Sequence, residues 1–121
     1  MIDLAETKII KLMKELINRN GSDLHLTGDT VPFFRIQGQM IPADSLPISS
    51  VVLREELELL VGKNKFDNFI KNKDFDCSFG LEGIARFRIN LFFDRGHVSC
   101  VMRALNNKIP SFSVIGLPES V

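Results

Sequence analysis

The sequence predicts an α+β fold, in which helices pack on a mostly antiparallel sheet. Apolar residues recur at helical spacing in three segments, and they alternate with polar residues in five others. These segments follow one another in the order α-β-β-α-α-β-β-β, which lacks the regular alternation of a parallel α/β sheet. A length of 121 residues suits one domain with one core.

The first predicted element is an amphipathic helix over residues 3–19. Asp3 and Glu6 resemble an N-terminal capping pair, and Asn20-Gly21 is a suitable stop because glycine accepts the left-handed conformation. Its apolar face is formed by Ile9, Ile10, Leu12, Met13, Leu16 and Ile17.

Two strands follow the first helix. Residues 22–26 alternate polar and apolar side chains, which is typical of a half-buried strand. Residues 28–29 turn the chain, and residues 33–40 are predicted to form the second strand. Two prolines in residues 41–48 favour a loop there.

The middle of the chain is predicted to be helical. Apolar residues at helical spacing predict a helix over residues 50–62, which Ser49 or Ser50 caps. A shorter helix follows over residues 64–72, with its phenylalanines on one side.

The last part of the predicted sheet contains a hairpin. Three strands are predicted, over residues 74–79, 84–94 and 97–105. Arg95-Gly96 fits a two-residue hairpin loop because glycine tolerates positive φ, and Asp94 then pairs with His97. In this register one face of the hairpin is wholly apolar, and a slip of one residue would mix the two faces.

The same register places Arg88 directly opposite Arg103. Like charges facing each other destabilise a sheet by about 0.2–1 kcal/mol. An anion between them would offset this cost, since two guanidinium groups match phosphate oxygens. Alternatively, pairing Cys77 with Phe87 would place Asp76 opposite Arg88 in a structural ion pair. A third interpretation is that both arginines are simply solvated.

The other candidate residues give weaker indications of a functional site. His25 is predicted to lie on the outer face of its strand, solvated or hydrogen-bonded rather than catalytic. Cys77 and Cys100 fall on apolar strand faces and are predicted to be buried free thiols. Phe92 and Leu105 form a partner-contact patch or pack under a helix. Two cysteines and two histidines form no cluster with metal-ligand spacing, so we expect no metal site.

Several functions are disfavoured by composition and by missing motifs. The 15 basic and 15 acidic residues balance, so general nucleic-acid binding is not expected. No apolar run reaches the roughly 20 residues of a membrane-spanning helix, and we see no signal peptide. No GxxxxGK[ST] loop is present, since Leu57 replaces the first glycine before Gly62-Lys63. We therefore expect no catalysis by this chain alone.

Several sequence blocks together resemble the N-terminal domain of PilT-type twitching-motility ATPases, which belong to the secretion-ATPase superfamily. The later blocks are Ala85-Arg86-Phe87-Arg88-Ile89-Asn90-Leu91-Phe92, Arg95-Gly96, Val101-Met102-Arg103, Ile109-Pro110-Ser111 and Leu117-Pro118. The earlier blocks are Ser22-Asp23-Leu24-His25-Leu26 and Phe34-Arg35-Ile36-Gln37-Gly38. The resemblance spans nearly the whole chain, and the block from the hairpin onward is specific in combination.

The resemblance implies a PAS-like domain over residues 1–106 and a linker over residues 107–121, leading to a RecA-like ATPase domain. Such proteins are cytoplasmic homohexameric motors that retract type IV pili. Their N-terminal domain packs on the ATPase domain of the neighbouring subunit, and its arginines help to close the nucleotide site. Arg88 and Arg103 match that arginine pair and would contact the phosphates.

The resemblance also implies the surroundings of the complete motor. ATP and Mg²⁺ would bind the full-length protein, with none bound by this chain alone. The motor would act at the inner face of the cytoplasmic membrane, on the platform protein of the pilus and without inserting into the membrane. The start of the domain near Met1 resembles the retraction type. The alternatives are a stand-alone PAS-like module that binds a ligand or protein, and a small nucleic-acid-binding domain.

Overall fold

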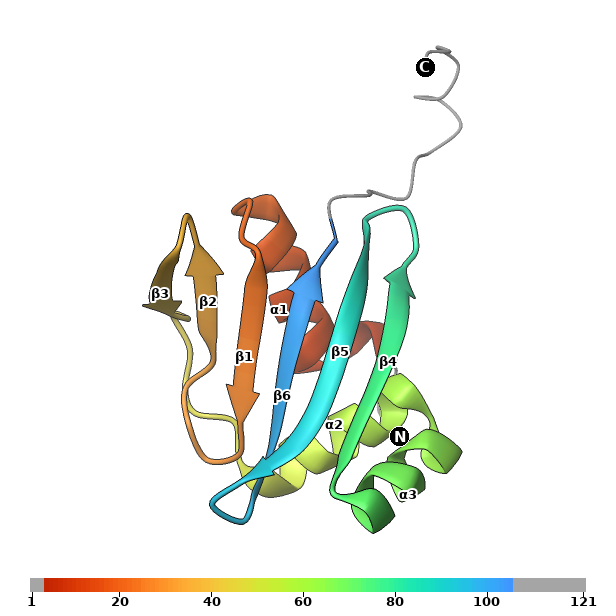
Figure 1. Cartoon of the computed structure of the whole chain (residues 1–121). Helices are drawn as coiled ribbons and strands as arrows, with labels where there is room; N and C mark the ends of the chain where they lie inside the picture. Colours follow the sequence, from red (N-terminus) through yellow and green to blue (C-terminus); the bar gives the residue numbers. More distant parts are fainter. Residues whose placement is uncertain (1–3, 106–121) are drawn as a thin grey trace.

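A computed structural model describes residues 4–105 of the chain as one sheet with helices beside it (Figure 1). The elements are the 3-10 helix η1 (Leu4–Glu6), α1 (Lys8–Asn18), β1 (Asp23–Thr27), β2 (Phe33–Ile36), β3 (Gln39–Pro42), α2 (Ser50–Val61), α3 (Lys63–Asn72), β4 (Asp74–Leu81), β5 (Ala85–Asp94) and β6 (His97–Ala104). The six strands are ordered β3-β2-β1-β6-β5-β4, and every neighbouring pair is antiparallel. The predicted α+β class is confirmed.

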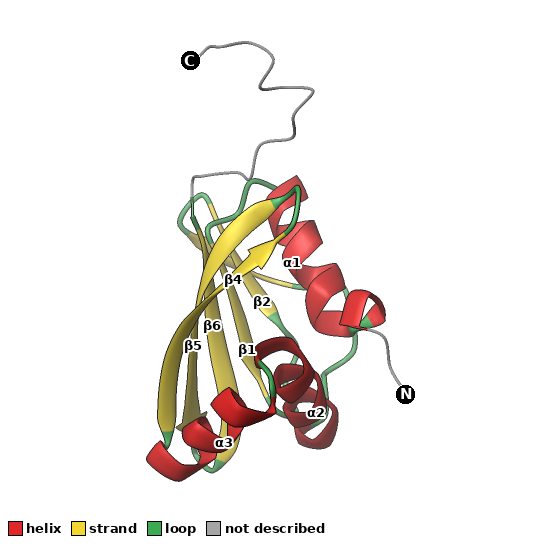
Figure 2. Ribbon diagram, turned by 90° about the vertical axis from the view of Figure 1, so that its right-hand side faces the viewer, coloured by secondary structure: helices red, strands yellow, loops and turns green. Residues whose placement is uncertain are grey.

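All three α-helices lie on one side of the sheet (Figure 2). The core fills the space between them, from α1 and α2 to the inward face of the strands. Its largest fully buried side chains include Phe34, Phe69, Phe87, Met13 and Leu57. Among the described residues no helix covers the other side, which we call the open face.

The second predicted strand is in fact a hairpin of two strands. Gln37 and Gly38 both have positive φ, of 52° and 80°, so the chain reverses within residues 33–40. Ile36 then pairs with Gln39, and β3 continues into the predicted loop as far as Pro42. The prediction of one long strand was wrong because alternation continues through so short a turn.

The ends of α1 differ from the prediction in detail. Asp3 lies outside the described residues, and the cap is Thr7, whose side chain accepts a hydrogen bond from the backbone of Ile10. At the other end Asn20, with φ of 57°, takes the left-handed conformation expected of Gly21. Gly21 is needed for a different reason, since a Cβ there would collide with the Leu16 side chain.

The later helices and strands agree closely with the sequence. Of the two serines proposed as the cap of α2, Ser49 is the one that accepts a hydrogen bond from Val52. The third helix ends at Asn72, and the next residue, Lys73, caps it in the left-handed conformation with φ of 72°. The linker predicted over residues 107–121 lies outside the described residues.

A buried carboxylate joins α1 to α2. Glu56 of α2 is only 4% exposed, and it accepts hydrogen bonds from the backbone N–H groups of Lys8 (3.1 Å) and Ile9 (3.0 Å). These N–H groups belong to the first turn of α1 and have no partner within that helix. The positive end of the helix dipole also favours a negative charge there. Glu56 therefore fixes the start of α1 against α2.

Replacing Glu56 should destabilise the fold. We expect E56A to lower the free energy of unfolding by about 2–3 kcal/mol, because it leaves two N–H groups without their charged acceptor. E56Q should lose about half as much, since its amide keeps one oxygen as an acceptor. Urea unfolding measures the free energy of unfolding of E56A and E56Q. E55A, at the exposed neighbouring position, is the control. Equal stabilities of E56A and E55A would contradict this role.

Candidate functional site

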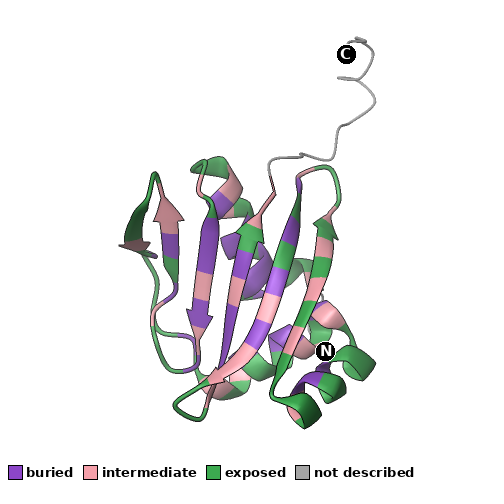
Figure 3. Cartoon of the chain, in the orientation of Figure 1, coloured by how far each residue is buried: buried purple, intermediate pink, exposed green. Residues whose placement is uncertain are grey.

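The β5–β6 hairpin has the predicted register. Asp94 pairs with His97, and Arg88 pairs with Arg103 across the two strands. The turn places both Arg95 and Gly96 at positive φ, of 55° and 85°. Figure 3 shows the resulting alternation of buried and more exposed residues along β5. The register prediction is confirmed, and it places both paired arginines on the open face.

The two arginines line a hollow in the open face, which we call the arginine pocket. Its volume is about 360 Å³, and it is lined by Asp76, Arg88, Asn90, Val101 and Arg103. All five residues come from β4, β5 and β6, so adjacent strands hold them. Guanidinium and amide N–H groups are donors that suit an anion, while the Asp76 carboxylate opposes one.

The alternative interpretation, an ion pair between Asp76 and Arg88, is wrong. Ser78 stands opposite Arg88, while Asp76 pairs with Asn90, a shift of two residues from the predicted register. No ion pair within 4 Å involves Arg88 among residues 4–105. A shift of two residues keeps every side chain on its face, so the apolar pattern could not distinguish the two registers.

The ion pair in this region belongs to Arg103 instead. Its Nε lies 3.5 Å from Oδ2 of Asp23 on β1. Asp23 is 6% exposed and stands in register with Arg103 on one side and Arg35 on the other. The sequence reasoning missed Asp23, because only the pairing of β1 with β6 brings positions 80 residues apart together.

His25 lies two residues after Asp23 on the open face, opposite Phe33 on β2 and Val101 on β6. Its Nε2 is buried and has no hydrogen-bond partner among the described residues. Burial lowers the pKa of His25 below its usual value; the Asp23 carboxylate opposes this shift and the Arg35 guanidinium adds to it. The neutral ring is therefore favoured, and the predicted solvated or hydrogen-bonded state does not describe Nε2.

The remaining candidates have structural environments. Cys77 and Cys100 are free thiols as predicted, although only Cys100 is fully buried. Burial raises the pKa of both thiols, which disfavours reactive thiolates. Phe92 pairs with Ser99 and lies on the same face of β5 as Arg88, so it does not pack under a helix of the described residues. Leu105, in contrast, lines a hollow at the end of α1.

A serine, a histidine and an aspartate also meet at the start of α2. Ser50 Oγ lies 3.2 Å from His97 Nδ1 and donates to Asp29 Oδ2, also at 3.2 Å. Asp29 Oδ2 is 3.6 Å from the same ring nitrogen. A catalytic triad needs the carboxylate and the nucleophile at different nitrogens of the ring. This cluster therefore ties the hairpin to α2 and is not built for nucleophilic catalysis.

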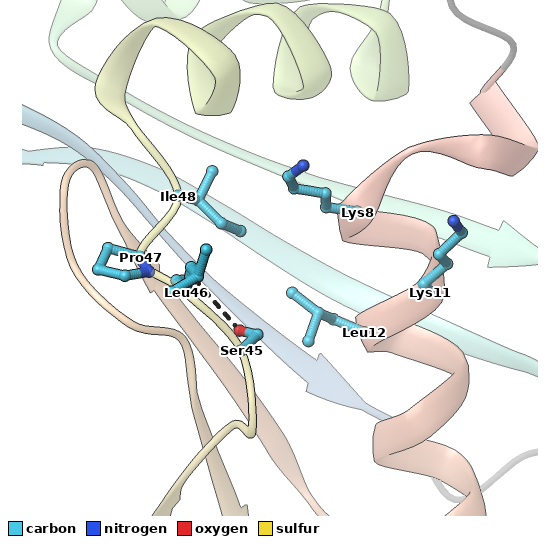
Figure 4. A pocket seen from close by; sticks show the side chains of 7 residues that line it. All are labelled: Lys8, Lys11, Leu12, Ser45, Leu46, Pro47 and Ile48. Carbon is cyan, nitrogen blue, oxygen red and sulfur yellow. Dashed lines mark hydrogen bonds between the residues drawn. The ribbon is translucent and has the colours of Figure 1, made fainter.

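A larger groove than the arginine pocket lies between α1 and the loop before α2 (Figure 4). It has a volume of about 430 Å³ and is lined by Lys8, Lys11, Leu12, Ser45, Leu46, Pro47 and Ile48. Leu46 is 83% exposed, so the groove is open to solvent, whereas Leu12 and Ile48, which also line it, belong to the core.

Within residues 4–105, no group of three or more His, Cys, Asp or Glu side chains could hold a metal ion. None of the helices in the same range has the length and apolar character required to cross a membrane.

Two curated proteins resemble the chain in sequence. It is 28% identical over 109 residues to the type IV pilus ATPase PilU of Pseudomonas aeruginosa, and the aligned region covers 90% of this chain and 28% of PilU. It is 24% identical over 111 residues to the type IV pilus retraction ATPase PilT of the same organism, and that alignment covers 92% of this chain and 32% of PilT. The chain thus spans about a third of these relatives or less. No family model matches it.

Solved structures have the same fold. The crystal structure of the pilus retraction motor PilT with bound ADP matches with a TM-score of 0.76 and 32% identity, over 94% of this chain and 34% of that one. The ATPase DotB of Legionella pneumophila matches with a TM-score of 0.71 over 92% of this chain and 32% of DotB; its 19% identity supports the fold alone. These findings confirm the resemblance to the N-terminal domain of PilT-type ATPases.

The lowered pKa of His25 predicts a dependence of stability on pH. Between that pKa and about 6.5 the unfolded chain binds more protons than the folded one. The contribution of His25 should therefore be lost as pH falls through this window, at no more than about 1.4 kcal/mol per pH unit. Urea unfolding of the wild type and H25Q should show a steeper dependence in the wild type, and H97Q serves as the control. Parallel curves for the wild type and H25Q would contradict the assignment.

Proposed function

We propose that this chain is the N-terminal domain of a hexameric pilus motor ATPase, and that it contributes Arg88 and Arg103 to a nucleotide site. The similarity to PilU and PilT supports the proposal that the chain is a domain of a pilus motor ATPase. The observation that carries the site is the pairing of the two arginines, directly opposite each other in a pocket on the open face.

The open face gives this pocket access to a partner. Another domain can approach the arginine pocket without displacing a helix of the described chain. In the proposed motor the partner is a RecA-like ATPase domain of the neighbouring subunit, and residues 107–121 link the domain of residues 1–106 to its own ATPase domain. The site is then completed between two subunits.

The donor chemistry of the pocket fits the phosphates of ATP. Arg88 and Arg103 each offer a planar fork of N–H groups, and Asn90 adds an amide in the same pocket. Guanidinium groups at this place would stabilise the negative charge that develops during phosphoryl transfer. Among residues 4–105, Asp76 is the only carboxylate that lines the pocket, so the ligands of Mg²⁺ would come from the ATPase domain.

The proposed motor is cytoplasmic and works at the inner face of the membrane on the platform protein of a type IV pilus. Retraction is the direction we propose, because PilT is the solved structure that shares 32% identity with this chain. This chain alone supplies arginines but no phosphate-binding loop, so hydrolysis would require the following domain.

A second candidate function is a stand-alone PAS-like module that binds a small ligand. The apolar groove beside Leu12 and Ile48 is the observation that favours it. Its exposure to solvent makes it a poorer container than an internal cavity. Native mass spectrometry of the purified chain separates the two candidates, since a stoichiometric co-purified ligand would favour the module.

Variants of the full-length protein test the arginine site. We expect R88A and R103A each to lower kcat for ATP hydrolysis by about 100-fold or more, because a group that stabilises the transition state is lost. R88K should recover little, since lysine keeps the charge but not the fork.

The matched control is R86A, because Arg86 is an exposed arginine of the same strand and face that does not line the pocket. Near wild-type kcat in R86A would show that loss of one positive charge on β5 is not the cause. The site proposal fails if R88A and R103A also keep wild-type kcat and KM in an assembled motor. The chain by itself should show no ATP turnover.

A further inference from the structure

Asp23 is a buried carboxylate at the edge of the arginine pocket, and the proposed function gives it no role. It lies on β1, between Arg35 on β2 and Arg103 on β6, and it is in register with both. Asp23 is only 6% exposed, whereas the Arg103 side chain that reaches it is 70% exposed. Its ion pair among the described residues is with Arg103.

The geometry places Asp23 behind Arg103 as seen from the pocket. Arg88, Arg103 and Asp23 stand in consecutive register across β5, β6 and β1. Arg103 lines the arginine pocket, whereas Asp23 does not. The contact with Asp23 is made at Nε of Arg103, the nitrogen nearest the chain. The guanidinium of Arg103 therefore contacts the buried Asp23 and also lines the arginine pocket.

Arg103 needs an anchor such as Asp23 for two reasons. Its side chain is 70% exposed, and a long exposed side chain samples many rotamers. It also faces Arg88 directly, and repulsion between the two guanidinium groups would drive it away from the pocket. Both effects reduce the fraction of time for which the two arginines point at the same anion.

We propose that Asp23 is a positioning residue, which holds Arg103 beside Arg88 so that both can bind one polyphosphate. This inference rests on the proposed function of the pocket as a phosphate site. Asp23 itself touches no phosphate. It lowers the cost of ordering Arg103, as the residues that support a preorganised binding site do.

The sign of the effect distinguishes this role from plain electrostatics. Removing a nearby negative charge ordinarily strengthens anion binding. Asp76 provides that comparison, because it lines the same pocket and has no ion pair within 4 Å among residues 4–105. D76N should therefore tighten binding, whereas D23N should weaken it although it removes the same charge.

The test uses the assembled full-length protein, in which the proposed site is complete, with inorganic tripolyphosphate as the probe, by calorimetry at low salt. We expect D23N to weaken binding by about fivefold to tenfold and D76N to tighten it by a few fold. In an R103A background D23N should no longer weaken binding, because its effect acts through Arg103. A D23N loss that persists without Arg103 would mean general damage to the sheet and would overturn the proposal.

A second readout keeps the proposal testable without phosphate. Hydrogen exchange at the Arg103 Nε–H, followed by NMR, should be about fivefold faster in D23N than in the wild type and unchanged in D76N. Unchanged exchange in D23N, or tighter tripolyphosphate binding, would overturn the positioning role while the phosphate site stands. If R88A and R103A bind tripolyphosphate as tightly as the wild type but exchange responds as expected, the proposed phosphate site fails and the anchoring of Arg103 by Asp23 remains.

Discussion

The register of β5 against β6 is the constraint on which the rest of the site depends. A two-residue turn with both residues at positive φ closes the hairpin, and the wholly apolar inner face resists any slip of one residue. Once Asp94 pairs with His97, Arg88 must face Arg103. The repulsion between them is small beside the burial of the opposite face, so the fold tolerates it.

Because the described helices pack on one side of the sheet, this register leaves Arg88 and Arg103 accessible on the open face. The helices occupy the inner side of the sheet, and Glu56 fixes the start of α1 against α2. Polar residues of the same strands therefore remain on the open face, where another domain can reach them. A sheet covered on both faces would have hidden the same arginines, which would then need buried partners.

The two arginines are equivalent by register but not by environment. Arg103 has a carboxylate, Asp23, at its Nε, whereas Arg88 has no ion pair within 4 Å among residues 4–105. Each interior strand has two neighbours, and the neighbour of β6 on its far side is β1. This asymmetry follows from strand order rather than from the hairpin alone.

The sequence by itself determined the fold class, a serine cap at position 49 or 50 and the pairing of Arg88 with Arg103, because periodicity and turn chemistry are local signals. Only the tertiary structure decided which partners the arginines have. In the structure, β4 pairs with β5 two residues away from the predicted register, so Asp76 is not opposite Arg88 although every side chain keeps its face. Asp23 lies opposite Arg103 because β1 pairs with β6, a strand far away in the sequence. Long-range pairing depends on how the whole core closes, and no local pattern encodes it.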